Sequence, residues 1–385
     1  MKRISSIDII RGLVMIIMPL DHVRDLLQLD SLGSPTNLAT TTPLLFFTRW
    51  ITHLCAPTFV FLSGVSAWIA LNAASDKKAG RRFLLTRGLV LIGIEFTLVN
   101  FGMSADVRFR YFIFEVIATI GAGLVLVSFL SRLSWRVVAV IAAILVFGQP
   151  LLALIPIPTS PVPRFVATLF FSLNVFSGKN VTFLIAYPIL PWLGIMLAGF
   201  VAGRLFTLAP QRRARIFLRL GLGALALFIV LRFSNAYGDP VPWSAQKDAV
   251  FTLLSFFNVN KYPPSLLFSL VTLGITLLCL SAAEGKDNAV TRFLLVYGKV
   301  PMFYFLVHFY LIHLLMFAMV FLQGFHAADL RFGPFLFGRP EKGAGLPLAG
   351  IYAVWIFVVL VLYPVCKWYG KYKAEHREKK WLRYL

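Results

Sequence analysis

The chain has 385 residues, of which 59% are hydrophobic, and its mean hydropathy is +0.81. No soluble fold needs so much apolar sequence, so the composition predicts an integral membrane protein. The formal net charge of +21 does not indicate nucleic-acid binding, because the basic residues form short clusters between apolar runs. Three cysteines, Cys55, Cys279 and Cys366, lie far apart in apolar runs. Their spacing predicts neither a disulfide framework nor a metal site, and we expect no metal.

The first apolar stretch, from Ser5 to Asp25, carries several ionisable residues although it is apolar enough to enter a bilayer. If it is a helix, most of them fall in one sector about 100° wide. The residues of this polar stripe are Asp8, Arg11, Met15, Met18, His22 and Asp25. Arg24 falls on the opposite side. Arg11 and His22 are three helical turns apart, a separation of roughly 16 Å.

Two interpretations of the polar stripe are open. Arg11 and His22 lie near the two ends of a span, where charged residues commonly anchor a helix in the headgroup layers. Anchoring does not explain the shared sector, because an anchor gains nothing by facing its neighbours. Ionisable residues that face inward in lipid usually line a site or a water-filled path. We therefore expect the stripe to line a central cavity.

A transmembrane helix needs about 17 to 25 apolar residues, and we find ten runs of suitable length. They predict an all-α fold, a polytopic helical bundle of about ten transmembrane helices. The expected spans are 7–29, 46–72, 83–102, 112–130, 136–155, 182–206, 216–233, 265–283, 297–322 and 346–369. No small-residue cleavage site follows the first run, so we expect it to be a retained first span and not a cleaved signal peptide. Segments 165–176 and 249–257 are too short to span and are predicted to be re-entrant or interfacial.

The loops between these spans differ in charge. With the N-terminus inside, about two-thirds of the 37 lysine and arginine residues fall in cytoplasmic segments. The positive-inside rule therefore predicts that both termini are cytoplasmic. We expect one transmembrane domain over residues 1–370 and a basic cytoplasmic tail over 371–385.

Two pairs of polar residues lie near the expected outer ends of spans. Arg49 and His53, four residues apart on one helix face, are either interfacial anchors or part of a site. Lys261 and Tyr262 belong to the turn NKYPPS, whose paired prolines fix an extended turn before a helix begins. They either bind an anionic or sugar ligand or sit at the headgroups.

Polar residues also lie inside spans. Tyr304 and His308 are four residues apart, so they either form a polar clasp between helices or line the same cavity. Glu95 and Glu115 need partners in lipid, and pairing with Arg87, Arg108 or Arg110 is expected. The common motifs of soluble enzymes, such as the P-loop, GxSxG and HExxH, are absent from the sequence.

Four stretches carry a resemblance to a known family: RISSIDIIRGLVMIIMPLDHVRD from Arg3, TRWITHLCAPTFVFLSG from Thr48, NKYPPS from Asn260 and GKVPMFYFLVHFYLIH from Gly298. The chain resembles bacterial membrane proteins related to the catalytic domain of heparan-alpha-glucosaminide N-acetyltransferase, within a wider group of transmembrane acyltransferases. The resemblance covers nearly the whole chain. It implies a multi-pass protein of the bacterial cytoplasmic (inner) membrane.

The resemblance also concerns the polar stripe. In the related acyltransferases that modify surface polysaccharides, an arginine followed eleven residues later by a histidine marks the first helix and is tied to activity. Arg11 and His22 match that spacing. The lysosomal enzyme is similar in its SxDxxRG opening but has asparagine at the position of His22, and its proposed active histidine lies in the following outer loop. This chain has no histidine between His22 and His53.

The resemblance implies acyl transfer from cytoplasmic acetyl-CoA or another acyl-CoA to an amine or hydroxyl of a sugar or glycan acceptor at the outer face. We expect His22 to act as general base, because the ordinary pKa of imidazole, about 6.5, leaves a neutral fraction at physiological pH. Asp21 or Asp25 is expected to orient the imidazole, with helix geometry favouring Asp25. Arg11 is expected to face the donor phosphates or the acyl carbonyl. The candidate substrate-binding residues are Asp8, Arg49, His53, Lys261, Tyr304 and His308.

An alternative is a transporter or flippase that uses the same intramembrane polar residues as an ion relay. Many transporters show internal symmetry between halves, and none is evident in this sequence. A third possibility is a membrane scaffold without catalytic activity, which would give the polar stripe no role. The expected partners are the lipid bilayer, acyl-CoA and a sugar or glycan, and no nucleic acid. The acyl group, the acceptor, a covalent acyl-enzyme and the oligomeric state are left open by the sequence.

Overall fold

The computed structural model describes residues 4–152, 154–333 and 336–384. Lys2 and Arg3 of the expected cytoplasmic N-terminus and Leu385 of the expected tail lie outside the described residues. The α-helices are α1 Ser5–Leu27, α2 Pro43–Thr52, α3 Cys55–Ala73, α4 Lys77–Ile94, α5 Asn100–Ser104, α6 Val116–Leu130, α7 Trp135–Phe147, α8 Gln149–Leu152, α9 Pro161–Phe171, α10 Ile189–Ala202, α11 Pro210–Ser234, α12 Ala249–Phe257, α13 Leu266–Ala283, α14 Ala289–Gly298, α15 Pro301–Leu322 and α16 Leu348–Glu375.

Shorter elements complete the described fold. The strands are β1 Tyr111–Phe114, β2 Asn174–Ser177 and β3 Thr182–Ile185. A π-helical turn, η2 Glu95–Val99, joins α4 to α5, and 3-10 turns cover η1 Asp30–Leu32, η3 Gly203–Thr207, η4 Ala327–Asp329 and η5 Lys380–Arg383.

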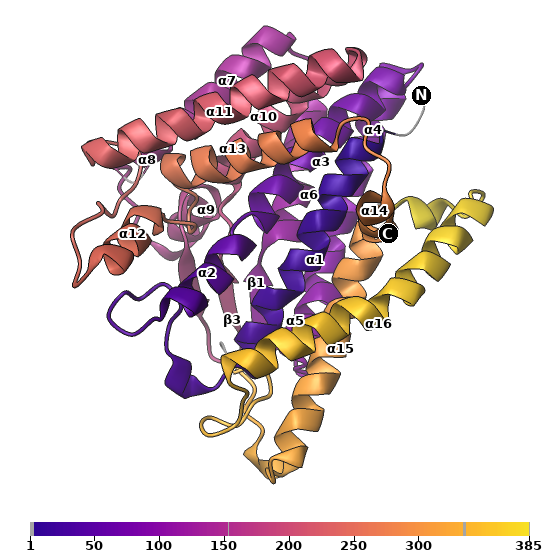
Figure 1. The fold of residues 1–385 in the computed structure, drawn as a ribbon. Helices are drawn as coiled ribbons and strands as arrows, with labels where there is room; N and C mark the ends of the chain where they lie inside the picture. The colour runs from indigo at the N-terminus through magenta and orange to yellow at the C-terminus, as the bar shows by residue number, and fades with distance from the viewer. Residues whose placement is uncertain (1–3, 153, 334–335, 385) are drawn as a thin grey trace.

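Helix α1 runs through the bundle and is surrounded by other helices (Figure 1). It contacts α14, α15, α16, α3, α13 and α2, and most of its residues are buried. Its closest neighbour is α14, because Gly12 and Gly298 let the two backbones touch. A Cβ on Gly298 would lie 1.8 Å from the carbonyl oxygen of Asp8. Small residues at such contacts are the usual device of helix packing in membranes.

Among the described residues, seven helical stretches are long and apolar enough to cross a membrane, and the expected count of about ten is not confirmed. They are Pro43–Ala73, Lys77–Ser104, Ile189–Thr207, Pro210–Ser234, Leu266–Ala283, Pro301–Leu322 and Leu348–Glu375. The prediction of a mostly helical membrane protein is therefore confirmed. The expected spans 7–29, 112–130 and 136–155 are not among the seven. Helix α1 has the length of a span but carries the polar stripe, and α6 and α7 are short apolar helices.

The expected all-α fold is interrupted by a small sheet. Strands β1 and β3 pair in parallel, and β2 pairs antiparallel with β3. Residues 112–114 of β1 and 182–185 of β3 were expected at the starts of the spans 112–130 and 182–206. A short apolar run fits a strand as well as a helix, so the pattern did not separate them. Side chains alternate between the two faces of a sheet. Ile113, Leu184 and Val175 therefore share one face, and this face lines a cavity.

Asn100 fixes the position of β1. Its side-chain amide donates to the carbonyl oxygens of Glu95 and Ile113 at 2.8 and 3.1 Å, and its carbonyl oxygen accepts from the backbone N–H of Ile113 at 2.7 Å. These bonds satisfy backbone groups that the π-helical turn and the strand end leave open. The residue that follows β1, Glu115, is thereby held at the start of α6.

The two short apolar segments are placed differently. The segment 249–257 is helix α12, whose final carbonyls accept hydrogen bonds from the buried Arg232 guanidinium at Ser255, Phe256 and Asn258. The segment 165–176 is divided between the end of α9 and strand β2. β2 lies at one edge of the sheet, and its Val175 lines the cavity described next.

Candidate functional site

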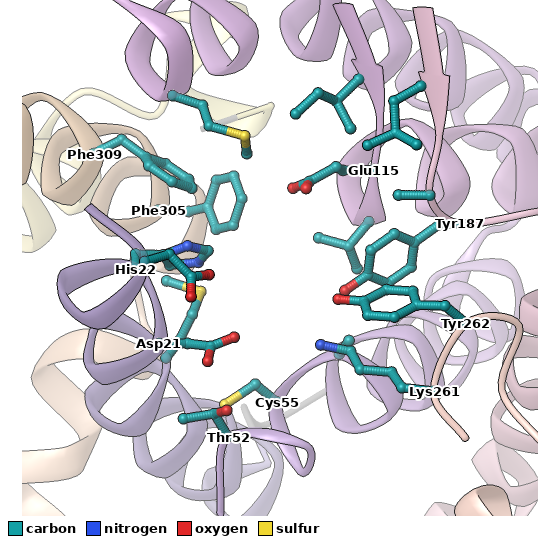
Figure 2. A pocket seen from close by; sticks show the side chains of 18 of the residues that line it. Asp21, His22, Thr52, Cys55, Glu115, Tyr187, Lys261, Tyr262, Phe305 and Phe309 are labelled. Atoms are coloured by element: carbon teal, nitrogen blue, oxygen red, sulfur yellow. The ribbon is translucent and has the colours of Figure 1, made fainter. Parts of the chain in front are cut away.

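A cavity of about 530 Å³ lies between the C-terminal half of α1 and the small sheet. We call it the His22 cavity. Figure 2 shows Asp21 and His22 on one side and Glu115, Tyr187, Tyr262 and Lys261 on the other. Asp25, Thr52 and Cys55 also line it. Its volume is in the range of small-molecule sites in proteins.

Asp21 is the centre of a buried ion-pair network at this end of α1. It pairs with Arg24 at 2.6 Å and with Arg49 of α2, and Arg24 also pairs with Asp25 at 2.5 Å. Arg24 was expected on the side of α1 away from the stripe, and its long side chain reaches both carboxylates. This network joins α1 to α2 and compensates the charge of Asp21.

His22 is positioned by packing. Its ring centroid lies 4.4 Å from that of Phe309 and 5.2 Å from that of His308, both on α15. The expected contact, in which Asp21 or Asp25 accepts a hydrogen bond from the His22 ring, is not found among the described residues. His308 Nδ1 lies 3.2 Å from the carbonyl oxygen of Tyr304, so Nδ1 carries the proton. The other nitrogen of His308, Nε2, is buried without a hydrogen-bond partner among the described residues.

The opposite wall comes from the NKYPPS turn and from Tyr187. Lys261 Nζ lies 4.9 Å from the ring centroid of Tyr262 and 5.8 Å from that of Tyr187. The Asp239 carboxylate holds the turn, because it accepts from the N–H of Asn260 at 2.9 Å and from the Ser265 hydroxyl at 2.6 Å. The sequence left open whether Lys261 faces a ligand or the headgroups, and the structure places it in the His22 cavity.

Two cations set the electrostatics of Tyr262. Burial alone raises the pKa of a phenol, but Lys261 and Arg49 outweigh it and lower the pKa of Tyr262 below its ordinary value. The phenol oxygen also accepts a long hydrogen bond of 3.5 Å from Arg49. Tyr262 thus links the turn to the network of Asp21.

Glu115 is a site residue that sequence reasoning did not select. Its carboxyl group faces the His22 cavity (Figure 2), and no hydrogen bond or ion pair joins that group to another described residue. The expected pairing of Glu95 and Glu115 with arginines is also not found there. Glu95 instead accepts from the N–H of Ala118 at 2.9 Å, and Arg110 pairs with Asp106. The sequence feature that could have pointed to Glu115 is an acidic residue placed next to a short apolar run.

A second cavity, of about 300 Å³, lies at the N-terminal half of α1. We call it the Arg11 cavity. Its described lining includes no aspartate or glutamate. Five basic side chains line it: Arg11, Arg87, Lys299, Lys373 and Arg383. The C-terminal turn closes part of it, since the ring of Tyr384 lies 6.4 Å from that of Phe83 on α4.

Arg11 is oriented by two neighbours. Its guanidinium pairs with Asp8 at 2.9 Å, one turn earlier on α1, and donates to the Ser66 hydroxyl of α3 at 3.0 Å. Asp8, expected to bind substrate, therefore contacts Arg11. The basic lining of this cavity fits a ligand with several negative charges, such as a phosphate group.

The remaining candidates are placed less directly. His53 is buried with its ring 5.5 Å from Phe268, outside the described lining of both cavities. Tyr304 is fully buried, with its ring stacked 5.7 Å from that of His308. Arg49 reaches the site through Asp21 and Tyr262. The structure thus brings Asp21, His22, Asp25 and Lys261 to one cavity and Arg11 to the other.

These features define a class: a polytopic helical membrane protein with two polar cavities of different charge inside its bundle. The profile of the family described as heparan-alpha-glucosaminide N-acetyltransferase, catalytic, matches residues 3–232. The match covers more than half of the chain, so the protein belongs to this family and the expected resemblance is confirmed. No curated protein matches the chain significantly. The matched region contains Arg11, His22 and Glu115, and Lys261 lies beyond it.

Proposed function

We propose that the protein is a membrane-embedded acyltransferase that moves an acyl group, acetyl in the first instance, from acyl-CoA to an amine or hydroxyl of a sugar or glycan. One observation carries the proposal: a single helix, α1, presents Arg11 to a basic cavity and His22 to a second cavity with carboxylates and aromatic rings. Family membership supports a membrane acyltransferase. The donor, the acceptor and the face of action are our proposal.

The basic cavity suits the donor. The phosphates of CoA carry several negative charges, and Arg11, Arg87 and Lys299 offer charge-assisted hydrogen bonds to them. We assign this cavity to the cytoplasmic side of the bacterial inner membrane, in line with the positive-inside rule and the expected orientation of the termini. Arg11 then serves the phosphates in preference to the acyl carbonyl.

The His22 cavity suits the acceptor. Aromatic rings of Tyr187 and Tyr262 offer flat apolar surfaces, and Lys261 and Glu115 offer polar contacts to a sugar. We place this cavity at the outer face. Asp25 keeps a half-exposed carboxylate near His22, whereas Asp21 is occupied by two arginines.

His22 acts as general base in this proposal. Its neutral imidazole takes a proton from the acceptor amine or hydroxyl while that nitrogen or oxygen attacks the thioester carbonyl. The new C–N or C–O bond forms, the C–S bond breaks, and the imidazolium returns its proton to the departing CoA thiolate. Phe309 and His308 hold the ring in place.

The test uses purified protein with acetyl-labelled acetyl-CoA and a panel of amino sugars. We expect labelled sugar from the wild type and a loss of label in His22→Ala. His376→Ala is the matched control, because His376 follows α16 and its imidazole hydrogen-bonds, among the described residues, only to the carbonyl of Tyr372. Transfer by a folded His22→Ala variant at the parental rate would refute the mechanism. Ion flux without any need for acyl-CoA would favour the transporter alternative.

A further inference from the structure

Three apolar side chains line both cavities: Phe59 of α3, Val116 of α6 and Phe305 of α15. Helix α1 adds Met15 to the Arg11 cavity and Met18 to the His22 cavity, about one turn apart. Apolar residues therefore occupy the level at which the two polar cavities meet. We call Phe59, Val116 and Phe305 the apolar constriction.

The constriction separates two different environments. A cluster of arginine and lysine side chains lies on one side of it, and carboxylates together with Lys261 lie on the other. Apolar constrictions between polar cavities exclude water and ions. A donor whose phosphates stay beside Arg11 has to extend its acyl end past these side chains to reach His22, roughly 16 Å away along the helix.

Phe305 is the most firmly held part of the constriction. Its ring packs edge-to-face on Phe309 at 5.3 Å and lies 5.6 Å from the ring of His308. These two residues also pack against His22. Moving the ring of Phe305 aside therefore disturbs the packing that positions the proposed base. Phe305 is buried, whereas Phe59 is only partly buried.

We propose that the apolar constriction selects the acyl donor by the cross-section of its acyl group, and that Phe305 is the main determinant. Unbranched acyl groups pass between the cavities, and groups branched next to the carbonyl are rejected. This inference rests on the proposed function, because it assigns the donor to the Arg11 cavity and the reaction to the His22 cavity.

The test compares butyryl-CoA with isobutyryl-CoA, which have the same atoms and differ in branching. In Phe305→Ala we expect the ratio of kcat/KM for isobutyryl-CoA to that for butyryl-CoA to rise about tenfold or more, the usual scale for one methyl group in an apolar site. Phe303→Ala is the matched control, since Phe303 stacks on Tyr369 at 3.9 Å outside the described lining of both cavities. An unchanged ratio in Phe305→Ala overturns the inference. A wild type that uses no acyl-CoA at all refutes the proposed function instead.

A second measurement tests the constriction without catalysis. In a chain whose three cysteines are changed to alanine, Ser63→Cys places a thiol in the Arg11 cavity. We expect a charged, membrane-impermeant thiol reagent to label it from one side of the membrane only, and from both sides once Phe305→Ala is added. Labelling from both sides with Phe305 intact overturns the inference, and so does one-sided labelling in the double variant.

Discussion

The Arg11 cavity and the His22 cavity differ in charge although one helix lines both. The first is smaller and lined by basic side chains, whereas the second combines carboxylates, a lysine and aromatic rings such as Tyr187 and Tyr262, which pack edge-to-face. A single proton or ion path needs polar groups along its whole length. The apolar constriction interrupts that path, so the difference favours two binding sites that share one reaction.

The way in which charge is compensated differs as well. Near His22, Asp21 and Arg49 join α1 to α2, and Arg24 completes the network. Near Arg11, the guanidinium pairs with Asp8 on the same helix and donates to the Ser66 hydroxyl of α3. Both arrangements join α1 to a neighbouring helix, the first through an ion pair with α2 and the second through a hydrogen bond to α3.

The largest expected effect concerns catalysis alone. His22→Gln keeps the size of the side chain but removes the base, so the rate of acyl transfer should fall by about 10² to 10⁴. The affinity for acetyl-CoA should stay unchanged, because His22 does not line the Arg11 cavity. Single-turnover kinetics and equilibrium CoA binding separate the two quantities. A matching loss of CoA affinity would break the division between the cavities.

The next effect concerns stability. Asp21→Asn removes the charge that compensates Arg24 and Arg49, and breaking such a buried ion pair costs about 3 to 5 kcal/mol. We expect a clearly lower Tm in detergent, measured by fluorescence. Asp287→Asn is the control, since its pair with Arg292 is exposed and its loss should leave Tm unchanged. Equal melting of wild type and Asp21→Asn would argue against a structural network.

A substitution at the contact between α1 and α14 should have a smaller effect, and that effect should reach both cavities. Gly298→Leu forces α14 away from α1, and overpacking of this kind costs about 1 to 3 kcal/mol. Tm should fall, and CoA binding and acyl transfer should weaken together, because both cavities depend on α1. Gly223→Leu on α11 is the matched control, as no heavy atom lies within 4 Å of its added Cβ. A selective loss of one activity would show that α1 does not couple the cavities.

The sequence predicted the polar stripe because helical periodicity alone places Arg11 and His22 on one face. It did not predict that apolar residues of three other helices divide this face into two cavities. The pairs of Arg24 were not predicted for a related reason: helical periodicity gives the direction of the Cα–Cβ bond, but not which carboxylates a long side chain reaches.

Glu115 was missed because its place depends on contacts far along the chain. The strand before it is fixed by Asn100 and by pairing with residues 182–185. A four-residue apolar run does not show in sequence whether it begins a helix or forms a strand. The expected count of about ten spans is not confirmed, and strand β1 occupies the start of one expected span, 112–130.

The most direct test of the account is a crossed kinetic measurement with one variant in each cavity. Arg87→Ala should raise KM for acetyl-CoA about tenfold, the scale of one hydrogen bond to a charged group, and leave KM for the amino-sugar acceptor unchanged. Lys261→Ala should do the reverse. If both variants raise KM for the same substrate, the two cavities do not bind different substrates, and the central claim is contradicted.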